Sequence, residues 1–222
     1  MNTTLLFKSL IILPFVAAVV VYLTGRISLR KEKFWGVSLA RALTVFFLLV
    51  EGCLLFFGVR SALQSGGLYL EIGEVSLMLD GIGLLLTAVV LFLGLMVALF
   101  SMDYMADEKG EEKYYALLLS TIGSIIGLGL SFDLFTLWIW FEAMAISTFL
   151  LVAFYNEEPA SLEAGIKYLV QSAVGSALVL FGIALIFSQT GSTSFSSSVT
   201  GPHDRPPSPL VATARQCCPW YE

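Results

Sequence analysis

Residues 134–154 read LFTLWIWFEAMAISTFLLVAF, and Glu142 is the only ionisable side chain in this run. An α-helix of this length can cross the hydrocarbon core of a bilayer. Placing an acid at the centre of such a helix costs roughly 2.5 to 3.5 kcal/mol on insertion scales. An acid that is kept there usually faces a protein interior or a water-filled path. The run therefore predicts a membrane protein that moves ions, rather than a soluble enzyme.

The composition of the chain also predicts a helical membrane protein. Of its 222 residues, 57% are hydrophobic and 13% are charged, whereas soluble domains carry about 25% charged residues. Most of the net charge of −5 lies in short loops, and no polybasic segment predicts binding to nucleic acid.

Six apolar runs are candidate membrane spans. They cover about residues 5–24, 36–58, 79–100, 114–130, 134–154 and 160–187. The first lacks a cleavage site and is followed by basic residues, which is typical of a retained helix rather than of a signal peptide. The sixth is entered through Pro159, a residue favoured in the first turn of a helix. We expect an all-α integral membrane fold with about six transmembrane helices.

Basic residues predict the orientation of these helices. Arg26, Arg30, Lys31 and Lys33 follow the first span, so this loop should be cytoplasmic and the amino terminus outside. The expected location is the inner or cell membrane of a prokaryotic type of cell. The segment YLEIGEVSLML at residues 69–79 alternates apolar and polar residues and predicts a hairpin or an amphipathic strand at the membrane surface.

The composition changes near residue 190. Residues 1–190 form the predicted transmembrane domain, whereas residues 191–222 hold five of the seven prolines and no amphipathic repeat. We expect this Pro/Ser-rich tail to be disordered, irregular or non-native. Cys217, Cys218 and His203 lie in it, and Cys53 lies in an apolar run. The sequence therefore predicts no haem, iron–sulfur or zinc site in this chain.

Glu142 and Lys167 are the candidate proton-relay residues, and each has a structural alternative. Glu142 could be a protonated acid that donates one hydrogen bond to a neighbouring helix, or a site that loads and releases a proton. Lys167 follows Glu163 by four residues, which favours a helical ion pair, and its stem could reach the interface. At 1.5 Å per residue, Glu142 should lie over two turns deeper than Lys167, so direct contact is not expected.

The remaining charged residues have structural interpretations. Arg41 is expected to extend to the interface, and Glu51, about 15 Å further along the same span, to make a helix contact. Asp80 and Asp133 are expected to cap the spans that follow them. An acidic segment is expected to form a solvated loop; it contains Asp103, Asp107, Glu108, Glu111 and Glu112.

Small residues predict close helix contacts. Gly123 and Gly127 form a GxxxG pattern in the fourth span, and Ser172, Gly175 and Ser176 form a small face on the sixth. Such faces allow helix backbones to approach closely, and we interpret them as candidate contacts with partner helices.

The segments 131–154 (SFDLFTLWIWFEAMAISTFLLVAF) and 161–192 (SLEAGIKYLVQSAVGSALVLFGIALIFSQTGS) resemble the antiporter-like proton-conducting subunits. This family includes membrane-arm subunits of complex I, subunits of membrane-bound hydrogenases, and multisubunit cation/proton antiporters. The motifs LDGIG (79–83), FSMDYM (100–105) and KYYALLL (113–119) look similar to the family pattern as well.

The resemblance implies a larger protein of about fourteen helices built on two inverted repeats. It implies that Glu142 matches the family's glutamate on its fifth helix, and that Lys167 and Tyr168 match a lysine and an aromatic residue on the sixth. In the family these residues belong to a buried proton relay. The seventh-helix lysine and the second repeat have no counterpart here, so we expect the amino-terminal part of such a subunit, from a truncated or frameshifted gene product.

Three functions follow as hypotheses. The chain is interpreted as a non-catalytic, proton-translocating subunit of a complex that resembles NADH:quinone oxidoreductase, with partner membrane subunits and with electron transfer to quinone in those partners. The first alternative is a subunit of a multisubunit sodium/proton antiporter. The second is a structural or non-functional membrane fragment that packs through Gly123 and Gly127.

Overall fold

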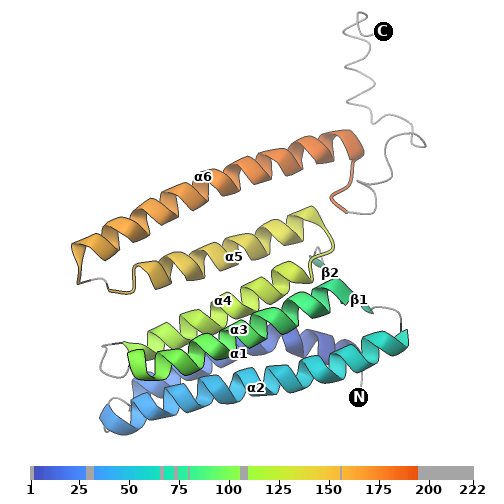
Figure 1. Ribbon diagram of the computed structural model, residues 1–222. Coiled ribbons are helices and arrows are strands. Elements are labelled where there is room, and N and C mark those ends of the chain that lie inside the picture. Colours follow the sequence, from blue (N-terminus) through green and yellow to red (C-terminus); the bar gives the residue numbers. More distant parts are fainter. Residues whose placement is uncertain are drawn as a thin grey trace, which may run out of the picture.

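The computed structural model describes most of the predicted transmembrane domain (Figure 1). The described residues are 3–28, 33–65, 68–72, 75–79, 81–105, 110–155 and 157–194. Of the predicted tail, only residues 191–194 belong to this part of the chain, and the rest of that prediction lies outside it. The predicted capping role of Asp80 also lies outside the described residues.

Six helices make up nearly all of the described structure. They are α1 (Thr3–Ser28), α2 (Lys33–Ser65), α3 (Gly81–Tyr104), α4 (Glu111–Gly129), α5 (Leu134–Val152) and α6 (Pro159–Thr190). Within the described residues, five of them are long and apolar enough to cross a membrane, and α4 is the exception. The prediction of an all-α integral membrane fold is confirmed.

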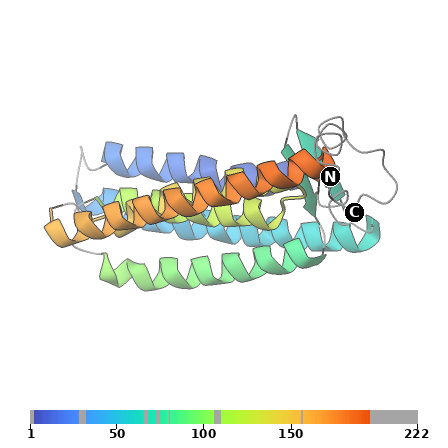
Figure 2. The same ribbon diagram turned by 90° about the horizontal axis from the view of Figure 1, so that it is seen from above.

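Successive helices run in opposite directions, and α4 occupies the centre of the arrangement (Figures 1 and 2). It packs against α1, α2, α3 and α5, whereas α6 packs against α5 at the edge of the stack. A central helix meets protein rather than lipid on most sides. This explains why α4 carries small and polar residues.

The hydrophobic core lies among α1, α2, α3 and α4. Fully or almost fully buried side chains include Val21 of α1, Leu48 of α2, Leu91 of α3, and Leu119 and Ile126 of α4. Three buried threonine and serine hydroxyls in this region are satisfied locally. They donate to carbonyl oxygens one turn earlier: Thr44 to Ala40 at 2.9 Å, Thr87 to Gly83 at 2.8 Å and Ser124 to Ser120 at 2.8 Å.

The predicted hairpin is present between α2 and α3. Strands β1 (Leu68–Ile72) and β2 (Val75–Leu79) are antiparallel, with Leu68 opposite Leu79. The amide of Met78 donates to the carbonyl of Leu130 at 2.8 Å, and Leu77 is 2% exposed. The hairpin is therefore fixed to the end of α4 and closes that end of the bundle.

Local sequence explains how α5 and α6 begin. The Asp133 side chain accepts a hydrogen bond from the Thr136 amide at 2.8 Å, so the predicted cap of α5 is confirmed. Pro159 lies in the first turn of α6, as predicted. The helix ends at Gly191, whose φ of 68° is a left-handed conformation that glycine adopts without a steric penalty.

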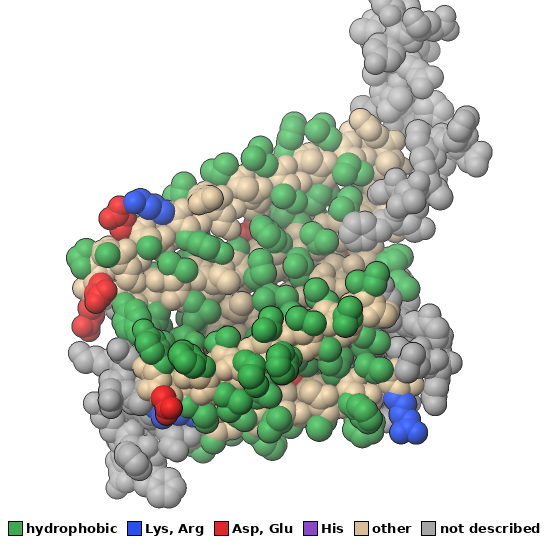
Figure 3. Space-filling model, viewed as in Figure 1, with side chains coloured by type: hydrophobic (Ala, Val, Ile, Leu, Met, Phe, Trp, Pro, Cys, Tyr) green, Lys and Arg blue, Asp and Glu red, His purple; other side chains and the backbone are tan. Residues whose placement is uncertain are grey.

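The outer surface of the helices is apolar. Figure 3 shows hydrophobic side chains over the visible face, with most charged groups toward the ends of the helices. Large exposed side chains include Phe92, Phe100, Leu178 and Phe181, each more than 60% exposed. A soluble protein would not expose such a continuous apolar surface, whereas a bilayer or neighbouring membrane helices would cover it.

Candidate functional site

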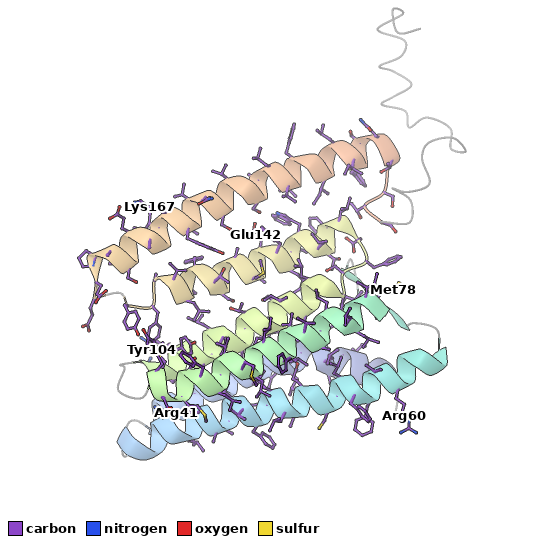
Figure 4. All side chains as sticks on the ribbon, viewed as in Figure 1. Arg41, Arg60, Met78, Tyr104, Glu142 and Lys167 are labelled. Atoms are coloured by element: carbon purple, nitrogen blue, oxygen red, sulfur yellow. The ribbon has the colours of Figure 1, made fainter. Side chains whose placement is uncertain are left out.

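Glu142 lies near the middle of α5. It follows Leu134 by eight residues and precedes Val152 by ten, which correspond to about 12 and 15 Å along the helix axis. Both ends of the helix are therefore distant from the acid (Figure 4). The Glu142 side chain is half-buried among the described residues. This position is the one expected for an acid inside the hydrocarbon layer.

The side of α5 that carries Glu142 faces α6. Trp138, four residues earlier and hence on the same face, donates its Nε1–H to Ser176 Oγ of α6 at 2.8 Å. Ser176 is 4% exposed, so part of the small-residue face predicted on the sixth span is used within the chain. Glu142 thus belongs to the contact region between the two outermost helices.

Hydroxyl groups connect α5 to both of its neighbours. Ser147 Oγ lies 3.1 Å from Ser120 Oγ of α4, and Thr148 Oγ1 donates to the Tyr168 hydroxyl of α6 at 3.2 Å. Hydroxyls both donate and accept hydrogen bonds. The half of α5 that follows Glu142 therefore carries hydroxyl groups that are able to take part in proton transfer. A purely apolar helix has no such groups.

Lys167 does not lie beside Glu142. Lys167 precedes Ser176 on α6 by nine residues, which is about two and a half helical turns. It therefore lies on the face of α6 opposite the one that meets α5. Its Nζ is 2.6 Å from Glu163 Oε1, and the two side chains are 74% and 66% exposed. Figure 4 shows Lys167 on the outer side of α6. The predicted helical ion pair with Glu163 is confirmed.

The GxxxG face of α4 is occupied within the chain. A Cβ at Gly123 would lie 2.8 Å from Pro14 Cβ of α1, and one at Gly127 would overlap the ring of Trp140 of α5. Trp140 also stacks on Phe15, with ring centroids 5.9 Å apart. The two glycines therefore make helix contacts, but with α1 and α5 rather than with a partner subunit.

Arg41 and Glu111 form an ion pair that sequence reasoning missed. Arg41 Nε and Nη2 donate to the two carboxylate oxygens of Glu111, the second at 3.0 Å. Their side chains are 19% and 1% exposed. The expectation that Arg41 extends to the interface is wrong, because a buried carboxylate on α4 holds its guanidinium.

The prediction that the acidic segment forms a solvated loop is also wrong in part. Glu111 and Glu112 are the first residues of α4 and are 1% and 8% exposed. Glu112 packs where a side chain at Gly25 of α1 would otherwise lie. Asp103 is exposed as predicted, whereas Asp107 and Glu108 lie outside the described residues. Because these residues are acidic, the sequence indicated a loop where α4 begins. The first turn of that helix faces the bundle.

Glu51 of α2 is the most deeply buried carboxyl of a membrane span in the described structure. It is 2% exposed, and neither Oε1 nor Oε2 has a hydrogen-bond partner among the described residues. Like Glu142 it lies mid-span, ten residues or about 15 Å beyond Arg41. No group of three or more His, Cys, Asp or Glu residues in the described part of the chain could hold a metal ion.

Together, these features define an integral membrane helical bundle with acids near the middle of two of its apolar helices. Two family models match the chain. Residues 131–205, which include Glu142 and Lys167, match the family described as "NADH:quinone oxidoreductase/Mrp antiporter, TM". Residues 69–115 match "NADH-Ubiquinone oxidoreductase (complex I), chain 5 N-terminus". Over these two segments the chain is similar to the antiporter-like membrane subunits of complex I and Mrp antiporters.

Curated relatives agree with this assignment. The chain is 34% identical to NADH-quinone oxidoreductase subunit N of Francisella tularensis subsp. holarctica over 61% of this chain, and 43% identical to that of Desulfitobacterium hafniense over 47%. It is 33% identical to Na(+)/H(+) antiporter subunit A1 of Staphylococcus aureus over 53%. The matches span 27%, 22% and 15% of those three relatives, so the chain spans about a quarter of their length or less.

A solved structure shares the fold. A chain of the membrane-bound sulfane sulfur reductase, an archaeal respiratory membrane complex, superposes with a TM-score of 0.76 over 89% of this chain and 40% of that chain. The sequence identity is 24%, so this similarity supports the helix arrangement and no residue role.

Proposed function

We propose that the chain contributes to proton translocation as part of an antiporter-like subunit in a membrane redox complex that resembles NADH:quinone oxidoreductase. The observation that carries this proposal is Glu142, an acid at the centre of α5 that faces α6 and lies within a segment matched by the family model. A carboxyl at that depth is costly, and acids kept within membrane helices usually mark ion or proton pathways. Other membrane subunits are the proposed partners, and electron transfer belongs to them.

Lys167 has a separate place in this proposal. Because it lies on the side of α6 away from α5 and pairs with Glu163, it does not tune Glu142 through direct contact. We expect it to hold a positive charge on the outer face of α6 and to act as a second relay position. Replacing it should therefore reduce translocation less than replacing Glu142.

The experiment is a proton-pumping assay on the membrane complex that contains this chain. Glu142→Gln keeps the size of the side chain and removes the exchangeable carboxyl proton, so pumping should fall at least tenfold. Glu158→Gln is the matched control, because Glu158 is exposed and precedes α6 without a capping hydrogen bond from its side chain. Undiminished pumping in Glu142→Gln would remove the proposal.

A second candidate function is a subunit of a multisubunit sodium/proton antiporter. The similarity to Na(+)/H(+) antiporter subunit A1 of Staphylococcus aureus favours it. The two functions differ in the driving reaction. Vesicles should acidify on addition of a quinone-linked electron donor in the first case, and on imposition of a sodium gradient alone in the second. Should the Glu142→Gln variant equal the parent in both assays, the chain would have a purely structural role.

The proposed orientation places the amino terminus outside a prokaryotic-type cell membrane. The last turns of α1, α3 and α5 and the first turns of α2, α4 and α6 share one end of the bundle (Figure 1). The basic residues that follow the first span in the sequence favour the cytoplasm for that end.

A further inference from the structure

We propose that Glu51 is a second proton-binding site, which is buried in the α1–α4 bundle and is separate from Glu142. The inference goes beyond the proposed function, because it depends on the packing of α2 and not on proton transfer at Glu142. Glu51 also lies outside both segments that the family models match, which cover residues 69–115 and 131–205.

The position of Glu51 on its helix is an interior one. Thr44, Leu48, Glu51 and Leu55 follow one another at spacings of three and four residues and are each at most 8% exposed. This spacing forms a single stripe along an α-helix. The stripe faces α1, α3 and α4, the helices that pack against α2. The carboxyl group therefore points into protein and not toward lipid.

A structural role does not account for this acid. A buried carboxyl stabilises a fold by accepting or donating hydrogen bonds, and within the described part of the chain Glu51 has none on either oxygen. Without a partner, an ionised carboxylate in such surroundings takes up a proton instead of keeping its charge. Glu51 is therefore a neutral carboxylic acid in this structure, and it becomes charged only when water or a cation reaches it.

Among the described residues of the neighbouring helices, no ionised side chain lies at the depth of Glu51. The described titratable groups on these helices lie within two turns of a helix end: Lys8, Tyr22 and Arg26 on α1, Asp103 and Tyr104 on α3, and Glu111, Glu112, Lys113, Tyr114 and Tyr115 on α4. A single carboxyl without other acidic ligands suits a proton better than a metal cation, which needs several oxygen ligands.

Polar side chains occupy the end of the bundle from which α2 and α4 begin. The Arg41–Glu111 pair lies at the end where α2 and α4 begin, and buried Thr44 and Tyr115 come one turn further in along these two helices. The Tyr115 hydroxyl is buried and has no partner among the described residues. Side chains on both helices lean toward their amino-terminal ends. The Glu51 side chain therefore leans toward this end of the bundle, from which the turn that holds Leu48 separates it.

The experiment is infrared spectroscopy of the full chain in lipid nanodiscs at pH 8. Under these conditions surface carboxyls are ionised, so a carbonyl band of a protonated acid reports a buried one. We expect Glu51→Gln to remove such a band. Transfer to deuterium oxide should shift that band in the parent, because the acid exchanges its proton with water. Glu142→Gln is the matched control and should leave the Glu51 component in place.

Three results would overturn the inference: no protonated-acid band that Glu51→Gln removes, a band that deuterium oxide does not shift, or loss of helical structure in Glu51→Leu. The last variant separates a proton site from a structural contact. Replacing an unpartnered acid by an apolar residue of similar size should keep or raise the melting temperature, whereas loss of a needed helix contact would lower it. Pumping assays on Glu142 variants do not enter this test, so the two proposals can fail independently.

Discussion

Arg41 on α2 and Glu111 on α4 join two helices through paired hydrogen bonds, although they are 70 positions apart in the chain. The guanidinium donates two parallel hydrogen bonds to the two carboxylate oxygens, which is the bidentate geometry that arginine favours. Because Glu111 is 1% exposed, its charge depends on this partner. The pair therefore fixes the relative position of α2 and α4 at the end of the bundle where both helices begin.

Removing one member of this pair should destabilise the bundle. Arg41→Ala leaves a buried carboxylate without a partner, and we expect the free energy of unfolding to fall by about 3 kcal/mol. The measurement is titration of the purified chain in mixed micelles with a denaturing detergent, followed by helical circular dichroism.

Two variants control this measurement. Lys167→Ala removes a pair whose side chains are both more than 60% exposed, and it should change stability by less than about 1 kcal/mol. The double variant Arg41→Met with Glu111→Leu should recover most of the loss, because it leaves no unpaired charge. Equal effects of Arg41→Ala and Lys167→Ala would contradict the assigned role of the buried pair.

Long-range pairing also marks the limit of what the sequence predicted. Hydropathy and residue spacing describe neighbours along the chain, so they predict local contacts. The ion pair predicted from the four-residue spacing of Glu163 and Lys167 is present. The hairpin, predicted from the alternation in residues 69–79, is present as well. The pairing of Arg41 with Glu111 depends on how two distant helices rotate against each other, which no local pattern encodes.

The acidic segment before α4 shows a second limit. Glu111 and Glu112 resemble the rest of a charged loop by composition, yet they begin a helix whose first turn is buried. The sequence does hold a usable signal, because acidic residues favour the first turn of a helix and the apolar run follows directly. The orientation of Lys167 away from α5 was a further point that only the packing of α5 on α6 could decide.

The close contact at Gly127 predicts a steep penalty for a small change. Gly127→Ala would place a methyl group inside the volume of the Trp140 ring, which stacks on Phe15. We expect a loss of about 1–3 kcal/mol from overpacking. Gly175→Ala is the matched control, since nothing lies within 4 Å of a Cβ at that position, and it should be neutral or stabilising. The detergent titration described above measures both, and an unaffected Gly127→Ala variant would argue against the packing of α4 on α5.

The cap of α5 predicts a smaller effect. Asp133→Ala removes a side chain that accepts hydrogen bonds from the Thr136 amide and hydroxyl, so the free energy of unfolding should fall by about 1–2 kcal/mol. Glu158 precedes α6 without a capping hydrogen bond from its side chain, and Glu158→Ala should have little effect. Thermal unfolding in nanodiscs compares the two variants, and a larger shift for Glu158→Ala would reverse the assignment of the caps.

The proposed orientation predicts which end of the bundle a polar thiol reagent reaches from each side of the membrane. Single cysteines at Glu158 and Thr193 sample opposite ends, because α6 runs from Pro159 to Thr190 between them. At 32 residues this helix is about 48 Å long, which exceeds the thickness of the hydrocarbon core. With Cys53, Cys217 and Cys218 replaced by serine, a membrane-impermeant maleimide added to intact cells should label Thr193→Cys and leave Glu158→Cys unlabelled. Inverted vesicles should show the opposite pattern. Labelling of Glu158→Cys in intact cells would place the basic first connection outside and reverse the direction in which protons reach Glu142 and Glu51.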